Sequence, residues 1–179
     1  MFQITKTVLI IIDVQEKLAS LVHEKEKVYK NIRALIKTAQ LLNIPIIYTE
    51  QVPEKIGKTI PKIAGLLRDH NPIIKSSFSC CGSKKFVSKL KALNRKQIIV
   101  TGIETHVCVY QTIADLLDLK FAVQVVADAV SSRTFENSKI ALKQIRELGA
   151  DIASAEMIIC ELMKTSEHEK FRDIMKLIK

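Results

Sequence analysis

The chain of 179 residues has a formal net charge of +9, with 47% hydrophobic and 26% charged residues. This composition excludes a disordered chain and suits one domain, residues 1–179, with a sizeable core. Basic and acidic residues interleave without an arginine-rich tract or an aromatic RNA-binding motif, so we expect a solvated lysine-rich surface and no nucleic-acid partner.

The cysteines and the apolar runs indicate the cellular compartment of the protein. Cys80, Cys81, Cys108 and Cys160 fit neither a metal-binding spacing nor a disulfide framework, which favours free thiols in a reducing cytoplasm. The first apolar run, residues 8–12, is too short for a signal or membrane segment. We therefore expect a cytoplasmic protein without a membrane partner.

The first half of the chain alternates predicted strands and helices. Residues 6–12 form a β-branched apolar run typical of a buried parallel strand, with Asp13 at its carboxyl end, where it either serves a site or caps a helix. Residues 28–42 have helical apolar spacing, and residues 46–49 predict a second strand ending at Glu50 and Gln51. The prolines in residues 52–61 predict a loop.

The middle of the chain holds the two other strand ends of interest. A short strand at Ile73 and Ile74 leads to Lys75, and Ser83 is expected to cap a helix over residues 84–93. The run of residues 98–100 predicts a central strand that turns at Gly102 into a helix, with Cys108 in its first turn.

The last third predicts further alternation. Residues 120–126 read as a strand, residues 138–148 as a helix capped by Thr134 or Asn137, and residues 150–159 as a final strand. Residues 166–178 predict a basic amphipathic helix that packs on this domain or on a partner subunit. Asp128 and Arg133 are interpreted as an ion pair or helix cap, with a subunit contact as the second reading.

This order of elements predicts an α/β fold, a three-layer αβα sandwich with a mostly parallel, Rossmann-like sheet. Strands of such a sheet direct their carboxyl ends to one crevice, where Asp13, Lys75 and Cys108 would meet. The helix end and the lysine would lower the pKa of the cysteine, and the aspartate would act as its base. Taken singly, Cys108 is better explained as a small buried hydrophobe, and Lys75 as a surface lysine.

Three motifs in order resemble the isochorismatase-like cysteine hydrolases, a family that includes nicotinamidases and N-carbamoylsarcosine amidohydrolase. They are Leu9-Ile-Ile-Ile-Asp-Val-Gln15, Ile73-Ile-Lys-Ser-Ser-Phe78 and Val100-Thr-Gly-Ile-Glu-Thr-His-Val-Cys-Val109. The resemblance covers residues 7–159 and implies the isochorismatase-like fold.

The resemblance also implies roles for individual residues. Asp13 would be the general base and acid, Lys75 the catalytic lysine and Cys108 the nucleophile. A cis peptide would join Ile103 to Glu104, and the backbone N–H groups of Glu104 and Cys108 would form an oxyanion hole. The remaining candidates line the substrate pocket or serve the structure: Gln15, Gln51, Phe78, Thr105 and His106.

Two departures from the family pattern narrow the expected reaction. Residues 49–55 contain no histidine where nicotinamidases hold a metal, so we expect no metal and no cofactor, and nicotinamide is not the expected substrate. Isochorismatases lack the cysteine present here as Cys108, which argues against isochorismate. Glu50, Gln51 and Pro53 instead resemble a metal-free branch of hydrolases whose natural substrates are mostly unknown.

The expected function is therefore hydrolysis of a C–N bond in a small amide-like or carbamoyl-like substrate through a Cys-Lys-Asp triad. The alternative is a catalytically silent binding or scaffold protein of the same fold. The resemblance also implies a homo-oligomer, a dimer or larger.

Overall fold

The computed structural model describes residues 1–178 and contains one six-stranded, fully parallel sheet. The strand order is β3-β2-β1-β4-β5-β6, so the direction of winding reverses at β1. The strands are β1 (Thr7–Ile12), β2 (Ile46–Gln51), β3 (Ile73–Lys75), β4 (Gln97–Ile103), β5 (Ala122–Ser131) and β6 (Asp151–Ala153). The predicted α/β class with a parallel sheet is confirmed.

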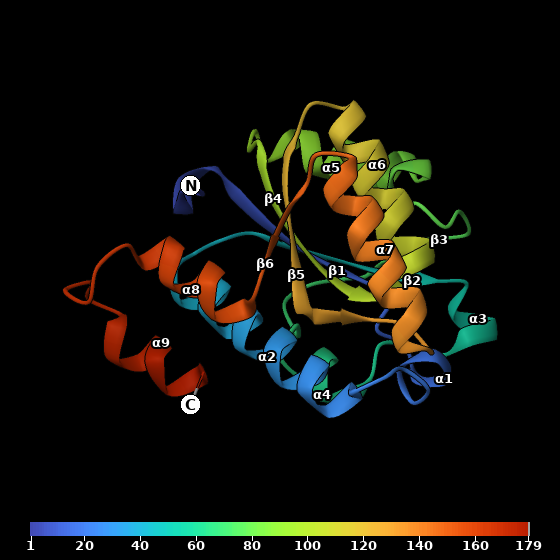
Figure 1. Cartoon of the computed structure of the whole chain (residues 1–179), viewed down its shortest axis with the longest axis horizontal. Coiled ribbons are helices and arrows are strands. Elements are labelled where there is room, and N and C mark those ends of the chain that lie inside the picture. Colours follow the sequence, from blue (N-terminus) through green and yellow to red (C-terminus); the bar gives the residue numbers. More distant parts are fainter. Residues whose placement is uncertain (179) are drawn as a thin grey trace.

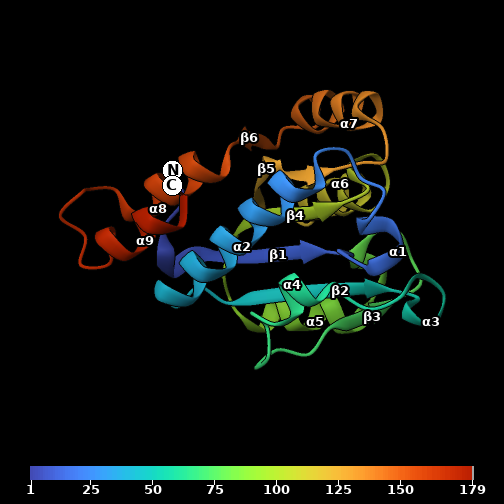
Figure 2. The same ribbon diagram turned by 90° about the horizontal axis from the view of Figure 1, so that it is seen from below.

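Helices cover both faces of the sheet (Figures 1 and 2). One core contains side chains from α2 (Lys25–Leu41), α4 (Pro61–Ala64), α8 (Ala155–Met163) and α9 (Phe171–Ile178). The other contains side chains from α5 (Lys84–Ala92), α6 (Tyr110–Asp118) and α7 (Phe135–Glu147). The short α1 (Glu16–Ala19) and α3 (Pro53–Ile56) lie beyond the carboxyl ends of the strands.

The sequence of β1 explains why both faces are covered. Leu9 and Ile11 pack into the first core, whereas Val8, Ile10 and Ile12 pack into the second. Successive side chains of a strand point to opposite faces, so a continuous apolar run can only be buried on both sides.

The close approach of β1 and β4 depends on Gly102. Gly102 pairs with Ile12 across the two strands and has φ of +136°, a conformation that favours glycine. A Cβ atom at this position would collide with the Ile12 carbonyl oxygen and lie 2.7 Å from its backbone nitrogen. The glycine thus brings the end of β4 against the end of β1.

Several predicted elements are confirmed, with small shifts at their ends. Ser83 caps α5 by accepting a hydrogen bond from the Phe86 N–H, and Thr134 caps α7 by accepting one from Asn137. The C-terminal amphipathic helix is α9, and it packs against α2 and α8 of the same domain.

Two sequence-based assignments are wrong. The final strand is only β6, because Ser154 caps a new helix, α8, inside the apolar run that was assigned to the strand. The segment 52–61 is not all loop, because Pro53 and Pro61 begin the short helices α3 and α4. A backbone N–H in the first turn of a helix has no partner within the helix, so proline is tolerated there.

Candidate active site

The candidate site lies at the carboxyl ends of β1, β2 and β4, next to the point where the strand order reverses. Each of these strands is followed by a non-glycine residue in the left-handed conformation: Asp13 (φ 51°), Val52 (φ 38°) and Glu104 (φ 58°). Such conformations cost about 1–3 kcal/mol each and gather at functional sites. Ligands of open α/β sheets bind at this kind of position.

The expected cis peptide between Ile103 and Glu104 is wrong, because residues 1–178 contain no cis peptide bond. The chain reverses here through the left-handed backbone of Glu104, with a trans bond. A π-helical turn, η3 (Thr105–Val109), follows and carries Cys108 into α6.

Asp13 and Lys75 form an ion pair buried beneath the site. The Lys75 Nζ atom lies 2.6 Å from Asp13 Oδ2, and the side chains are 0% and 2% exposed. The ammonium also donates to Gln51 Oε1 at 2.6 Å, and Thr49 Oγ1 donates to Asp13 Oδ1 at 2.7 Å. Lys75 is therefore no surface lysine, and both carboxylate oxygens of Asp13 are fixed in place.

Cys108 lies in the first helical turn after β4, as predicted, and lines the same pocket as Asp13. Its pKa is raised, first by burial and then by the negative charge of Asp13, while Lys75 acts in the opposite direction. The prediction of a lowered pKa is wrong, because the ammonium is paired with Asp13 and the thiol is desolvated. Burial of Cys108 and its position next to Asp13 thus favour the neutral thiol.

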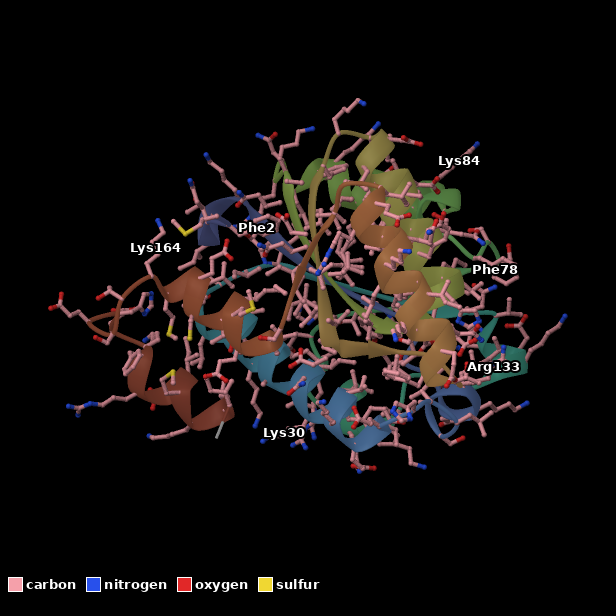
Figure 3. The ribbon with its side chains drawn as sticks, viewed as in Figure 1. Phe2, Lys30, Phe78, Lys84, Arg133 and Lys164 are labelled. Carbon is pink, nitrogen blue, oxygen red and sulfur yellow. The ribbon has the colours of Figure 1, made fainter. Side chains whose placement is uncertain are left out.

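The pocket has a volume of about 230 Å3. Its wall is mainly apolar, and it includes six of the residues expected in the site. Lining side chains are Asp13, Leu18, Gln51, Ile56, Phe78, Ile103, Glu104, Val107, Cys108 and Arg133. Phe78 and Arg133 lie at the same edge of the molecule, by α3 (Figure 3). Glu104 and Cys108 both border the space, as their expected oxyanion-hole role requires, and that role stays a prediction.

Arg133 is a pocket residue that sequence reasoning assigned elsewhere. Its Nε atom donates to Glu104 Oε2 at 3.2 Å, and its backbone N–H donates to Glu104 Oε1 at the same distance. The ion pair expected of Arg133 exists, but its partner is Glu104 and not Asp128. The side chain is 55% exposed, so part of the guanidinium remains free for solvent or a ligand. The one sequence feature that could have placed Arg133 in the pocket is its position two residues after the end of β5.

Three candidates, Gln15, Thr105 and His106, do not line the pocket themselves. Gln15 is fully buried and bonds to the backbone of Gln51 and Gly57, while Thr105 accepts from Ser138 Oγ at 3.2 Å. His106 lies 2.9 Å from Ser132 Oγ through Nδ1. Asp128 accepts from the Ala155 N–H at 2.8 Å and so caps α8, as one reading proposed. These side chains support the site's surroundings and do not line it.

Among residues 1–178, no group of three or more His, Cys, Asp or Glu side chains is placed to hold a metal ion. Asp13 is occupied by Thr49 and Lys75, and Gln51 bonds to Lys75. The donor set expected of a metal centre is thus already committed to hydrogen bonds.

The fold and the site together define a doubly wound α/β protein with a buried carboxylate–ammonium pair and a cysteine at the switch point of its sheet. The Isochorismatase domain model matches residues 7–157, and the chain belongs to the isochorismatase family.

Relatives cover nearly the whole chain. The "Secreted isochorismatase effector Isc1" of Phytophthora sojae is 38% identical, over 97% of this chain and 84% of the relative. "Isochorismatase domain-containing protein 2" of Danio rerio is 34% identical over 96% and 86%. The solved structure of "MAR1 Ribonuclease from Caenorhabditis elegans" has 39% identity and a TM-score of 0.93, covering 99% of this chain and 91% of that one.

A further solved structure is named for a covalently bound small molecule. "YcaC from Pseudomonas aeruginosa with hexane-2,5-diol and covalent acrylamide" has 25% identity and a TM-score of 0.91, covering 98% of this chain and 90% of that one. Within residues 1–178, none of the helices has the length and apolar character needed to cross a membrane.

Proposed function

We propose that the protein is a hydrolase that cleaves a C–N bond of a small amide-type or carbamoyl-type substrate. One observation carries the proposal: a thiol, Cys108, shares a pocket with a carboxylate, Asp13, that a buried ammonium, Lys75, holds in place. A nucleophile next to an oriented base is the minimum arrangement for covalent catalysis.

The raised pKa of Cys108 supports a mechanism in which the thiol loses its proton during the attack and not before it. The thiol reacts as Asp13 removes its proton, and the sulfur forms a C–S bond to the substrate carbonyl carbon. The N–H groups of Glu104 and Cys108 stabilise the resulting oxyanion. Asp13 then gives the proton to the leaving nitrogen as the C–N bond breaks. A water that Asp13 deprotonates attacks the thioester, releases the acid and restores the thiol.

The Lys75 ammonium keeps Asp13 ready for this cycle. Its 2.6 Å contact with Oδ2 fixes the orientation of the Asp13 side chain. The Thr49 hydroxyl does the same at Oδ1. Asp13 can therefore accept and return one proton in each half of the reaction.

The pocket favours a small, partly apolar substrate. Its volume of about 230 Å3 is below the usual range of about 300–1,000 Å3 for drug-sized ligands. Leu18, Ile56, Phe78 and Val107 offer apolar contacts, and the partly exposed Arg133 offers a polar one. The covalent acrylamide named for the Pseudomonas aeruginosa relative is itself a small amide, which favours a small amide-type substrate here as well.

The name of the Caenorhabditis elegans relative suggests a second activity, RNA cleavage. The charges of this pocket disfavour it, because Asp13 and Glu104 face a single lining cation, Arg133, which Glu104 already pairs. A phosphodiester would meet two carboxylates and no unpaired cation among the lining residues. Amide hydrolysis is therefore the better fit.

The test is turnover across a panel of small primary amides and carbamoyl compounds, with Cys108→Ala and Cys160→Ala compared. Wild type and Cys160→Ala should release ammonia or amine, and Cys108→Ala should not. Intact-mass measurement should show one acyl adduct on wild type at early times. Turnover that survives Cys108→Ala would reject the mechanism, and no turnover of any amide together with no adduct would favour the scaffold alternative.

A further inference from the structure

A groove between α2 and α9 gathers cations and no acids. Its volume is about 180 Å3, and it is lined by Lys30, Arg33, Ala34, Lys37, Lys176 and Leu177. The two helices pack side by side far from the pocket of Cys108, and Lys30 projects from α2 (Figures 1 and 3). None of these residues serves the proposed reaction. We call this feature the α2–α9 groove.

The cations of α2 form one stripe. Lys30, Arg33 and Lys37 are separated by three and four residues, so they lie on one face of the helix, spread over about 10 Å. Like charges at this spacing repel one another and destabilise a helix. A stripe of this kind becomes favourable when an anion covers it.

These charges are not neutralised within the described part of the chain. Among residues 1–178, Lys30, Arg33 and Lys37 have no carboxylate within 4.0 Å, whereas Lys176 pairs with Asp173 of its own helix at 3.2 Å. Lys30 and Arg33 are exposed, and Lys37 is half-buried. Their charges are therefore available to a ligand.

The groove also has a floor and an opposite wall. Ala34 is 4% exposed and lies between the flanking cations, so its small side chain leaves the depression open. Lys176 and Leu177 of α9 close the far side. The cations thus converge on one space from two helices, in contrast to lysines scattered over a convex surface.

We propose that the α2–α9 groove binds a chain of two or three linked phosphate groups, as in a free polyphosphate or the polyphosphate tail of a nucleotide. Lysine binds phosphate as a point charge, and Arg33 can bind it with two N–H groups. A single phosphate reaches only part of the 10 Å stripe, whereas a phosphate chain spans it. None of the described groove residues is aromatic, so the groove lacks the stacking surface typical of single-stranded nucleic-acid sites.

The test is calorimetric titration of the full chain with sodium tripolyphosphate at about 50 mM and about 200 mM salt. The groove variant is Arg33→Gln with Lys37→Gln, and the matched control is Lys84→Gln with Lys85→Gln, which removes two exposed lysines from α5 on the other face. Wild type and control should bind one tripolyphosphate per chain. The groove variant should lose affinity at least about tenfold, since each charged hydrogen bond contributes about that factor or more.

Two further measurements locate the binding site and distinguish a phosphate chain from a single phosphate. Amide NMR shifts on tripolyphosphate addition should concentrate on α2 and α9, and a nucleoside triphosphate should bind like tripolyphosphate while orthophosphate binds at least about tenfold more weakly. Thermal melts of both variants check that the fold is kept. Equal losses in groove and control variants, shifts elsewhere, or tighter binding of a single-stranded oligonucleotide would each overturn the proposal.

Discussion

Lys75→Met tests how much of the site's architecture rests on one buried ammonium. The Nζ atom has Asp13 Oδ2 and Gln51 Oε1 at 2.6 Å, and the carbonyl oxygens of Ser77 and Phe78 at 3.1 and 3.0 Å. Methionine fills a similar volume but leaves these acceptors without their donor. Removing one partner of a buried ion pair typically costs about 3–5 kcal/mol.

The assay is urea unfolding at pH 7. With a slope of about 2 kcal/mol per molar urea, the loss moves the midpoint down by about 2 M. Adding Asp13→Asn removes the stranded charge, so the double variant should be more stable than Lys75→Met alone.

Lys62→Met is the matched control, because Lys62 pairs with Glu26 at 2.8 Å with both side chains more than half exposed. Its midpoint should not move measurably. The reasoning is refuted if Lys75→Met shifts the midpoint no more than Lys62→Met, or if Asp13→Asn makes Lys75→Met less stable.

Three other predictions follow from the structure. Burial raises the pKa of Cys80 to about 12, so the folded state keeps a proton that the unfolded thiol loses above about pH 8.5. The free energy of unfolding should therefore fall as pH rises beyond that value, by up to about 1.4 kcal/mol per pH unit. The fall should be shallower in Cys80→Ala. Gly102→Ala should lower the melting temperature far more than Gly149→Ala, since both have positive φ but only a Cβ at Gly102 meets backbone atoms of Ile12. Equal effects would show that the positive φ, and not the collision, sets the loss of stability. Alkylation of Cys108 by a neutral reagent in Asp13→Asn should be slower than in wild type at pH 7, because the base is lost; mass spectrometry of the labelled peptide measures it, and an unchanged rate would remove Asp13 from the mechanism.

The sequence predicted those parts of the fold that local pattern determines. The runs leading into Asp13, Lys75 and Gly102 are short, apolar and β-branched, so their strand character and shared crevice could be inferred. The run of residues 150–159 was misassigned because a short apolar segment has no decisive period, and only the Ser154 cap separates β6 from α8.

Features that depend on tertiary environment were not predictable. The pairing of Glu104 with Arg133 joins residues 29 positions apart, and composition cannot specify it. The pKa of Cys108 was predicted in the wrong direction, because the helix end is visible in sequence but the desolvation and the nearby Asp13 carboxylate are not. The left-handed Val52 is the least foreseeable, since a β-branched residue resists that conformation.

The left-handed residues after β1, β2 and β4 have a consequence for the evolution of this protein. Each is a local loss of free energy that the two apolar cores must offset, so the margin against unfolding and the shape of the crevice are linked. Replacing Val52 with glycine would relieve the strain of its positive φ and should raise the stability of the protein, while the crevice would become conformationally more variable. Selection for heat tolerance alone would then tend to erode the crevice at these turns first.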